Sequence, residues 1–98
     1  MKKQYTSYQD TITFIEQCMA AHPHLITLQT IGKTWEERPI VLVTISLDVE
    51  YADNKPALLY TGTIHAREWI GNELAIKFID YVINNYRFNP KLKEALTR

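Results

Sequence analysis

Apolar residues recur at helical spacing near the start of the chain. The apolar positions of this first stretch are Tyr8, Ile12, Ile15 and Met19, and Pro23 follows them. Proline cannot donate a main-chain hydrogen bond and disfavours helical geometry in the residue before it. The pattern therefore predicts a helix from about Ser7 to Ala21.

A second stretch with helical spacing begins at Trp69. Its apolar positions are Ile70, Leu74, Phe78, Val82 and Tyr86. Together they make a stripe broad enough to face a sheet. We expect this helix to end near Asn84 to Tyr86, and Lys91 to Arg98 to begin another.

Three stretches between these helices are typical of strands. Leu25 to Ile31 and Ile40 to Leu47 are rich in β-branched residues, and the polar loop between them predicts a hairpin. Ala57 to Ile64 is apolar without clean alternation, as in a strand covered on both faces. Asp48 to Pro56 carries charged and turn-forming residues, so we expect a surface loop there. The order helix, strand, strand, strand, helix indicates an α/β sheet with helical cover.

A histidine and a glutamate lie where the third predicted strand passes into the second predicted helix. Imidazole nitrogen and carboxylate oxygen are ligand types that hold a catalytic zinc with one position open. His65 at the end of the strand and Glu68 in the first helical turn can converge on one point. We interpret them as two zinc ligands. The simpler alternative is a strand-end histidine beside an ordinary first-turn acid, which the helix dipole favours.

Two segments of the chain resemble the zinc carboxypeptidase family, specifically its A/B-type branch. One is Ile64 to Ile70, with the sequence Ile-His-Ala-Arg-Glu-Trp-Ile, and the other is Ile31 to Ile40, which is similar to the family's Ile-Gly-x-Thr-x-Glu-x-Arg-Pro-Ile hairpin. Their order and separation also match, and the resemblance extends from Tyr5 to the end of the chain.

The resemblance implies the N-terminal part of a three-layer α/β/α zinc-exopeptidase fold with a mixed sheet. Residues 1–98 would be a single partial domain, the N-terminal third of the catalytic domain. In the family a later strand lies between the second strand of the hairpin and the third strand. Because unpaired strand edges promote association, we expect either repacking of the third strand on the hairpin or self-association of the truncated sheet.

For function, the resemblance implies a metallocarboxypeptidase that uses Zn²⁺ to hydrolyse the C-terminal bond of peptides or proteins. His65 and Glu68 match the family's first two zinc ligands, and Arg67 matches an arginine that lines the substrate cleft. The third ligand, the general base, the oxyanion-stabilising arginine and the residues that grip the substrate carboxylate all lie beyond Arg98 in the family. We therefore expect no catalytic residue within this chain, and no activity from the chain alone.

Alternatives remain open for the protein and for several of its residues. The whole chain could be a non-catalytic peptide-binding or interaction module built on the same fold. Arg67 could be a solvated loop charge. His22 and His24 flank Pro23 in a turn that the resemblance places away from the metal, and Arg38 is expected to be a structural loop residue, as is Glu36.

The composition narrows the classes of partner. Eleven basic residues balance eleven acidic ones among 98, which gives no electrostatic footprint for nucleic acid or an anionic membrane. No apolar run approaches the ~20 residues that span a bilayer. Polar residues follow Met1-Lys2-Lys3 where a signal peptide would be apolar, so we expect no export signal in this chain. The compartment is undetermined: cytoplasmic as the chain stands, secreted if an upstream signal has been removed.

Overall fold

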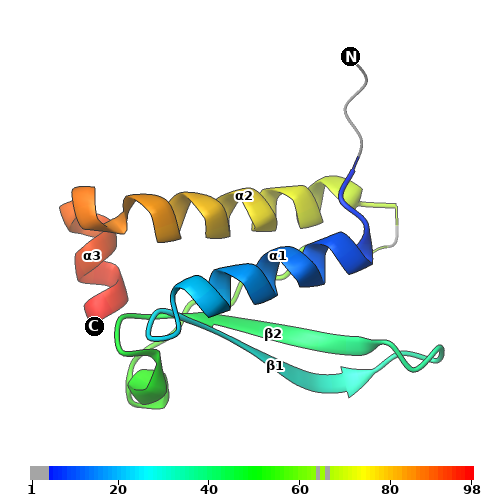
Figure 1. Cartoon of the computed structure of the whole chain (residues 1–98), viewed down its shortest axis with the longest axis horizontal. Helices are drawn as coiled ribbons and strands as arrows, with labels where there is room; N and C mark the ends of the chain where they lie inside the picture. The colour runs from blue at the N-terminus through cyan, green and yellow to red at the C-terminus, as the bar shows by residue number, and fades with distance from the viewer. Residues whose placement is uncertain (1–4, 64, 66) are drawn as a thin grey trace.

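Two helices lie side by side on one face of a two-stranded hairpin in the computed structural model, which describes residues 5–63, 65 and 67–98 (Figure 1). The elements in chain order are α1 (Tyr8–Ala21), β1 (Ile26–Lys33), β2 (Pro39–Ile45), η1 (Val49–Asn54), α2 (Trp69–Asn85), η2 (Tyr86–Phe88) and α3 (Pro90–Thr97). The helices α1 and α2 run in the same direction, so both begin at the same end of the molecule.

The three predicted helices are confirmed, and two of them have side-chain caps at their start. The hydroxyl of Ser7 accepts a hydrogen bond of 3.0 Å from the main-chain N–H of Asp10. The side-chain oxygen of Asn89 accepts from two N–H groups of α3, which has Pro90 in its first turn. Such caps satisfy N–H groups that have no partner within the helix. No helix in the described part of the chain is long and apolar enough to cross a membrane.

The hairpin and the helices share one hydrophobic core. β1 and β2 are antiparallel, with Ile26 opposite Ile45. Alternation along the strands turns Ile26, which is fully buried, toward the helices. The core cluster consists of Cys18, Leu25, Ile26, Ile79 and Ile83. Burial in this core raises the pKa of the Cys18 thiol, and the nearby Asp80 carboxylate raises it further.

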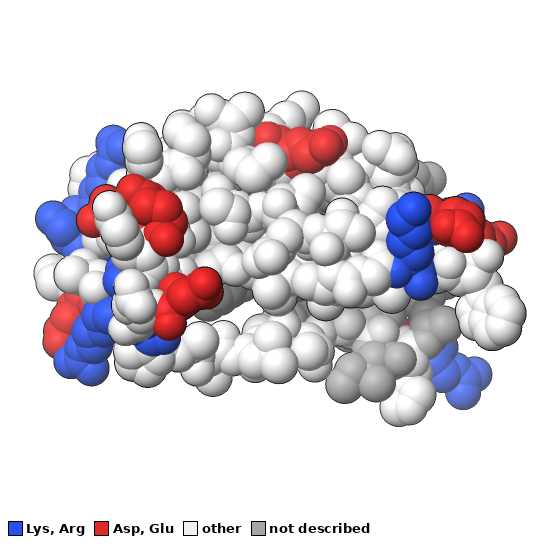
Figure 2. All heavy atoms as spheres, turned by 90° about the horizontal axis from the view of Figure 1, so that it is seen from below, with Lys and Arg blue, Asp and Glu red and all other residues white. Residues whose placement is uncertain are grey.

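The outer face of the hairpin carries few charges. In the register of the strands, Thr27 lies opposite Thr44 and Gln29 opposite Leu42. Neighbouring residues of a strand point to opposite faces, so these four residues point away from the helices, whereas Ile26 points toward the helices. Figure 2 shows the molecule from this side, with acidic and basic side chains gathered mainly toward the two ends. The helices form one layer of the described residues and the hairpin forms the other (Figure 1).

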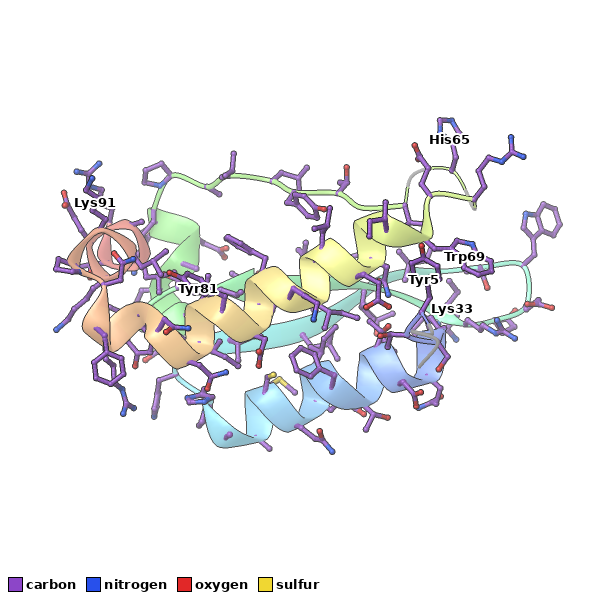
Figure 3. All side chains as sticks on the ribbon, turned by 90° about the horizontal axis from the view of Figure 1, so that it is seen from above. Tyr5, Lys33, His65, Trp69, Tyr81 and Lys91 are labelled. Carbon is purple, nitrogen blue, oxygen red and sulfur yellow. The ribbon has the colours of Figure 1, made fainter. Side chains whose placement is uncertain are left out.

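The third predicted strand is wrong for the residues that the structure describes. Residues 57–62 run extended but belong to no strand, Thr63 after them has a positive φ, and Ile64 lies outside the described residues. Figure 3 shows this segment running beside α2, on the side away from α1. No hydrogen bond joins a main-chain group of residues 57–62 to a main-chain group elsewhere in the described part of the chain. A strand needs a neighbour to pair with, and the sheet here contains β1 and β2 alone. The three-strand order, the mixed sheet and the third layer are thus not confirmed.

The molecule is more open than a compact protein of its size. Its accessible surface is 7940 Å², against about 5,800 Å² expected for a compact monomer of 11.5 kDa. Its radius of gyration is 14.2 Å, against about 12.6 Å expected. The difference in area exceeds the roughly 800 Å² that each partner buries in a stable interface. Leu58, in the extended segment of residues 57–62, contributes to this extra area, because the residue is 95% exposed.

We expect the extended segment to drive self-association. The segment combines unpaired main-chain groups with exposed apolar side chains, and its described residues carry no charge that would oppose pairing. Sedimentation velocity should show a mean mass that rises with protein concentration, and Leu58→Lys should shift the molecule toward monomer. Trp35→Lys is the matched control, because Trp35 is equally exposed but lies in the hairpin loop. A wild-type chain that stays monomeric at millimolar concentration would contradict this expectation.

A lysine ties α3 to the end of the hairpin. The Lys55 ammonium donates to the hydroxyl of Ser46 at 2.8 Å, to the carbonyl of Leu47 at 2.6 Å and to the carbonyl of Leu96 at 3.3 Å. Leu96 lies in the last turn of α3, where a positive charge is favoured by the helix dipole.

Lys55→Met should lower the free energy of unfolding by about 1–3 kcal/mol, because it keeps most of the side-chain volume but removes the donor from a half-buried polar cluster. Urea denaturation measures the change. Lys77→Met, at an exposed position of α2, is the control and should shift the unfolding free energy by less than about 0.5 kcal/mol. Equal effects of the two substitutions would show that the cluster does not hold α3 in place.

Candidate metal centre

The two predicted ligands lie where the extended segment meets the first turn of α2. Two glycines allow this approach. A Cβ atom on Gly62 would lie 2.6 Å from the carbonyl oxygen of Gly71, and one on Gly71 would lie 2.6 Å from the main-chain nitrogen of Thr63. Both distances are far below any normal contact, so the two backbones can lie this close only without side chains. The hydroxyl of Tyr60 also donates to the Gly71 carbonyl at 3.3 Å.

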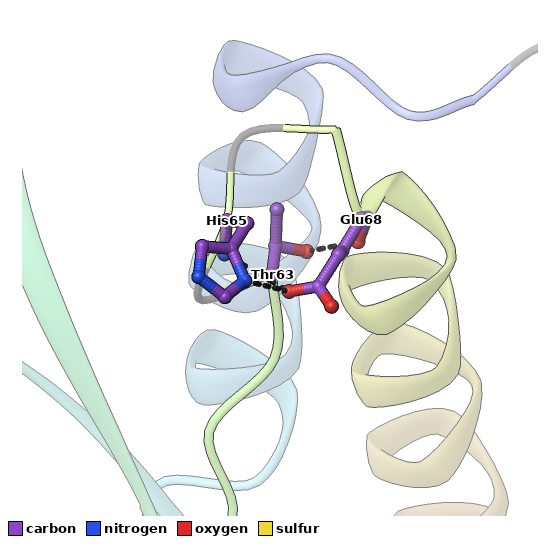
Figure 4. Close-up of polar contacts among 3 residues, drawn as sticks. All are labelled: Thr63, His65 and Glu68. Carbon is purple, nitrogen blue, oxygen red and sulfur yellow. Dashed lines mark hydrogen bonds and ion pairs between the residues drawn. The ribbon is translucent and has the colours of Figure 1, made fainter.

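The structure brings His65 and Glu68 together (Figure 4). The Nδ1 atom of His65 lies 3.2 Å from Oε1 of Glu68. The same carboxylate oxygen accepts a 2.9 Å hydrogen bond from the main-chain N–H of His65. The main-chain N–H of Glu68 in turn donates to the His65 carbonyl at 2.9 Å. Side chain and backbone of each residue therefore hold the other in place.

Glu68 does not cap the helix that it begins. It is the N-cap residue of α2, yet its side chain accepts no capping hydrogen bond from the first turn. The N-cap side chain of a helix ordinarily accepts from an N–H group two or three residues further on. Here the carboxylate turns back toward His65 instead. The carboxylate therefore faces His65 and not the first turn of α2.

The pair fits a zinc ion in separation and in chemistry. Ligands about 2.0–2.1 Å from a tetrahedral zinc lie about 3.3 Å from each other, close to the 3.2 Å that separates Nδ1 of His65 from Oε1 of Glu68. An imidazole nitrogen and a carboxylate oxygen are both ligand types that zinc accepts. Both side chains are open to solvent, with His65 76% and Glu68 52% exposed.

Two ligands are fewer than a catalytic zinc site requires. Among the described residues, no group of three or more His, Cys, Asp and Glu side chains could hold a metal ion. His22 and His24 follow the end of α1, at the opposite end of the molecule from the start of α2 (Figure 1). The Nδ1 atom of His24 lies 4.0 Å from a carboxylate oxygen of Glu50, so the structure does not bring these histidines to the pair.

Three further residues of the two motifs, Arg67, Trp69 and Arg38, occupy exposed positions. Arg67 lies in the turn between the two predicted ligands, and no described residue forms a hydrogen bond or ion pair with its guanidinium. Trp69 packs edge-on against Tyr5, with 5.4 Å between ring centroids (Figure 3). Arg38 lies in the hairpin loop, 3.6 Å from a carboxylate oxygen of Glu36.

Sequence reasoning missed the residues that shape this junction. The hydroxyl of Thr63 donates to the Glu68 carbonyl at 2.8 Å, and Glu73 is buried and accepts a hydrogen bond from the main-chain N–H of Thr6. The signal available for the junction was the pair of glycines, Gly62 just before the motif and Gly71 just after it. A glycine inside an expected strand or helix often marks a close backbone approach.

Comparison with known proteins identifies the family. The chain belongs to the zinc carboxypeptidase family, whose model matches residues 11–98. The zinc carboxypeptidase of Saccharothrix mutabilis subsp. capreolus is 30% identical over 92 residues, which cover 94% of this chain and 21% of the relative. Carboxypeptidase A1 of Sus scrofa is 28% identical over 92 residues, with the same two coverages. Carboxypeptidase D of Mus musculus is 27% identical over 96 residues, or 97% of this chain and 7% of the relative. The chain thus spans about a fifth or less of the length of these relatives.

Gly71→Ala should displace the junction and destabilise the chain. Alanine ordinarily stabilises a helix relative to glycine by about 0.5–1 kcal/mol. At Gly71 the added Cβ meets backbone atoms that cannot rotate away, so we expect a loss of about 1–3 kcal/mol instead. Thermal unfolding measures the sign. Gly32→Ala is the control, because the nearest atom to its Cβ is a side-chain carbon 3.8 Å away. Stabilisation by Gly71→Ala would mean that the two backbones do not lie in contact.

Proposed function

We propose that this chain carries two of the zinc ligands of a metallocarboxypeptidase, an enzyme that removes C-terminal residues from peptides or proteins. His65 and Glu68 would hold the metal. Arg67 would line the cleft that receives the substrate. The observation that carries the proposal is the 3.2 Å approach of His65 Nδ1 to Glu68 Oε1, in a chain that belongs to the zinc carboxypeptidase family.

The geometry of the junction supports a ligand role over a purely structural one. A solvent-exposed ion pair contributes only about 0–1 kcal/mol to stability, so this contact does little to hold the fold together. The carboxylate also leaves the cap of α2 unfilled in order to face the imidazole. This conformation adds little to the stability of the fold. It leaves two possible ligand atoms exposed at the separation that a metal ion requires, as expected of a binding site.

The surrounding residues have definable tasks in such a site. Zinc supplies Lewis acidity there when bound, which activates water and polarises a carbonyl oxygen. The main-chain N–H of His65 holds one oxygen of Glu68 and so orients the carboxylate. The guanidinium of Arg67 is free of the described residues and can donate to peptide carbonyl or carboxylate oxygens through its rigid fork of N–H groups.

The chain by itself would be inactive. Two ligands without a general base or an oxyanion donor do not assemble a reaction centre. The alternative function is a non-catalytic peptide-binding or interaction module. It also predicts that this chain is inactive, but it differs in predicting that a complete domain would be inactive as well. The names of the relatives, zinc carboxypeptidase and carboxypeptidase A1, support the enzymatic reading.

His65→Ala or Glu68→Ala should weaken cobalt or zinc binding at least tenfold while changing the free energy of unfolding by less than about 1 kcal/mol, because both side chains are exposed. Metal titration and urea denaturation measure the two effects. Glu36→Ala, which removes an exposed acid of the hairpin loop, is the control and should change neither. A large loss of stability with unchanged metal affinity would assign the pair a structural role.

A fusion tests the activity itself. This chain would replace the matched 92 residues of the Saccharothrix relative, and release of C-terminal residues from blocked peptides would be assayed with and without His65→Ala. We expect zinc-dependent hydrolysis that the substitution abolishes, and none from the chain alone. A folded, zinc-loaded fusion without hydrolysis would favour the non-catalytic module.

A further inference from the structure

Thr63 occupies a backbone conformation that a β-branched residue rarely adopts. Its φ is 57°, in the left-handed region. Steric repulsion between a branched side chain and the backbone disfavours that region. Such outliers persist where the surroundings hold them, and they gather at functional sites. Thr63 lies directly after Gly62 and two positions before His65.

The hydroxyl of Thr63 is used within the junction. It donates to the main-chain carbonyl of Glu68 at 2.8 Å (Figure 4). The same carbonyl accepts from the N–H of Gly71 at 3.0 Å. One carbonyl is therefore held from the extended segment and from the first turn of α2 at once. This carbonyl belongs to the residue whose carboxylate faces His65.

The left-handed conformation and the hydroxyl contact belong together. The Gly62 and Gly71 backbones are in contact, which fixes how close the extended segment lies to α2. The positive φ at Thr63 turns the chain at that point, and the hydroxyl reaches the Glu68 carbonyl from there. The carboxylate of Glu68 in turn accepts a hydrogen bond from the main-chain N–H of His65. The position of the Glu68 carbonyl therefore affects both the Glu68 carboxylate and the His65 imidazole.

We infer that Thr63 is a positioning residue of the metal centre: its hydroxyl fixes the backbone of Glu68 so that the carboxylate and the His65 imidazole meet at metal-binding separation. The inference rests on the proposed role of His65 and Glu68 as ligands. It adds a third residue, which touches neither the metal nor the substrate. Residues that orient metal ligands in this way change metal affinity by about 10–100-fold when they are removed.

Three substitutions separate the hydroxyl from the backbone strain. Thr63→Val keeps the branched shape and removes the hydroxyl, Thr63→Ser keeps the hydroxyl without the branch, and Thr63→Gly removes both. Each is made in a background with His22→Gln and His24→Gln, so that His65 is the one remaining imidazole of the three histidines in the chain. Cobalt(II) is added, and the loss of the Glu68 and Gly71 amide signals by paramagnetic broadening gives the binding midpoint.

Thr63→Val and Thr63→Gly should each raise the midpoint about tenfold, and Thr63→Ser should leave it within about twofold. Thermal stability should follow a different order, because Thr63→Gly relieves the left-handed strain and should melt no lower than the parent. A metal affinity that follows the hydroxyl while stability does not is the signature of positioning. Thr63→Val binding cobalt as tightly as the parent would overturn the inference.

One further variant keeps the two proposals distinguishable. His65→Ala in the same background removes a proposed ligand. If it binds cobalt as well as the parent, the ligand assignment itself fails, and the inference about Thr63 fails with it. If His65→Ala abolishes binding while Thr63→Val has no effect, the ligands stand and the positioning role of Thr63 is rejected.

Discussion

The contact between the backbones of Gly62 and Gly71 sets where the proposed ligand pair, His65 and Glu68, lies. Each would place a Cβ 2.6 Å from a backbone atom on the other side, so the extended segment can lie this close to α2 only because both side chains are absent. From that contact the chain turns at Thr63 and reaches His65, and the helix starts at Trp69 with Glu68 as its cap residue. The imidazole and the carboxylate meet because two stretches of backbone are held together just behind them.

The core and the ligand pair depend on different kinds of interaction. Ile26, Ile79 and Ile83 bury apolar surface between the hairpin and the helices, and this burial is the main source of stability available to the chain. The junction contributes hydrogen bonds at exposed positions, and each of these adds little stability in water. We therefore expect the fold to tolerate changes at the two proposed ligands, and their geometry to be sensitive to changes in the backbone contact beneath them.

The helices and the hairpin could be predicted because their signals are local. Three local signals each mark a segment that packs within this chain: Pro23, the β-branched residues on either side of the hairpin loop, and the apolar stripe of α2. Residues 57–63 carry an equally apolar signal, but apolar character cannot reveal whether a neighbouring strand is present to accept the hydrogen bonds. The spacing of His65 and Glu68 predicted that they could converge. The left-handed turn at Thr63 carries no such signal, because threonine is among the residues least expected there.

The two tryptophans of the chain experience different surroundings, and this gives the molecule a built-in optical reporter. Trp35 projects from the hairpin loop into water and should emit at long wavelength whatever the state of the junction. Trp69 opens α2 directly after Glu68, with its ring edge-on to Tyr5, so its emission should respond when the contacts of Glu68 change. Intrinsic fluorescence of this protein is therefore the sum of one constant component and one that depends on events at the start of α2.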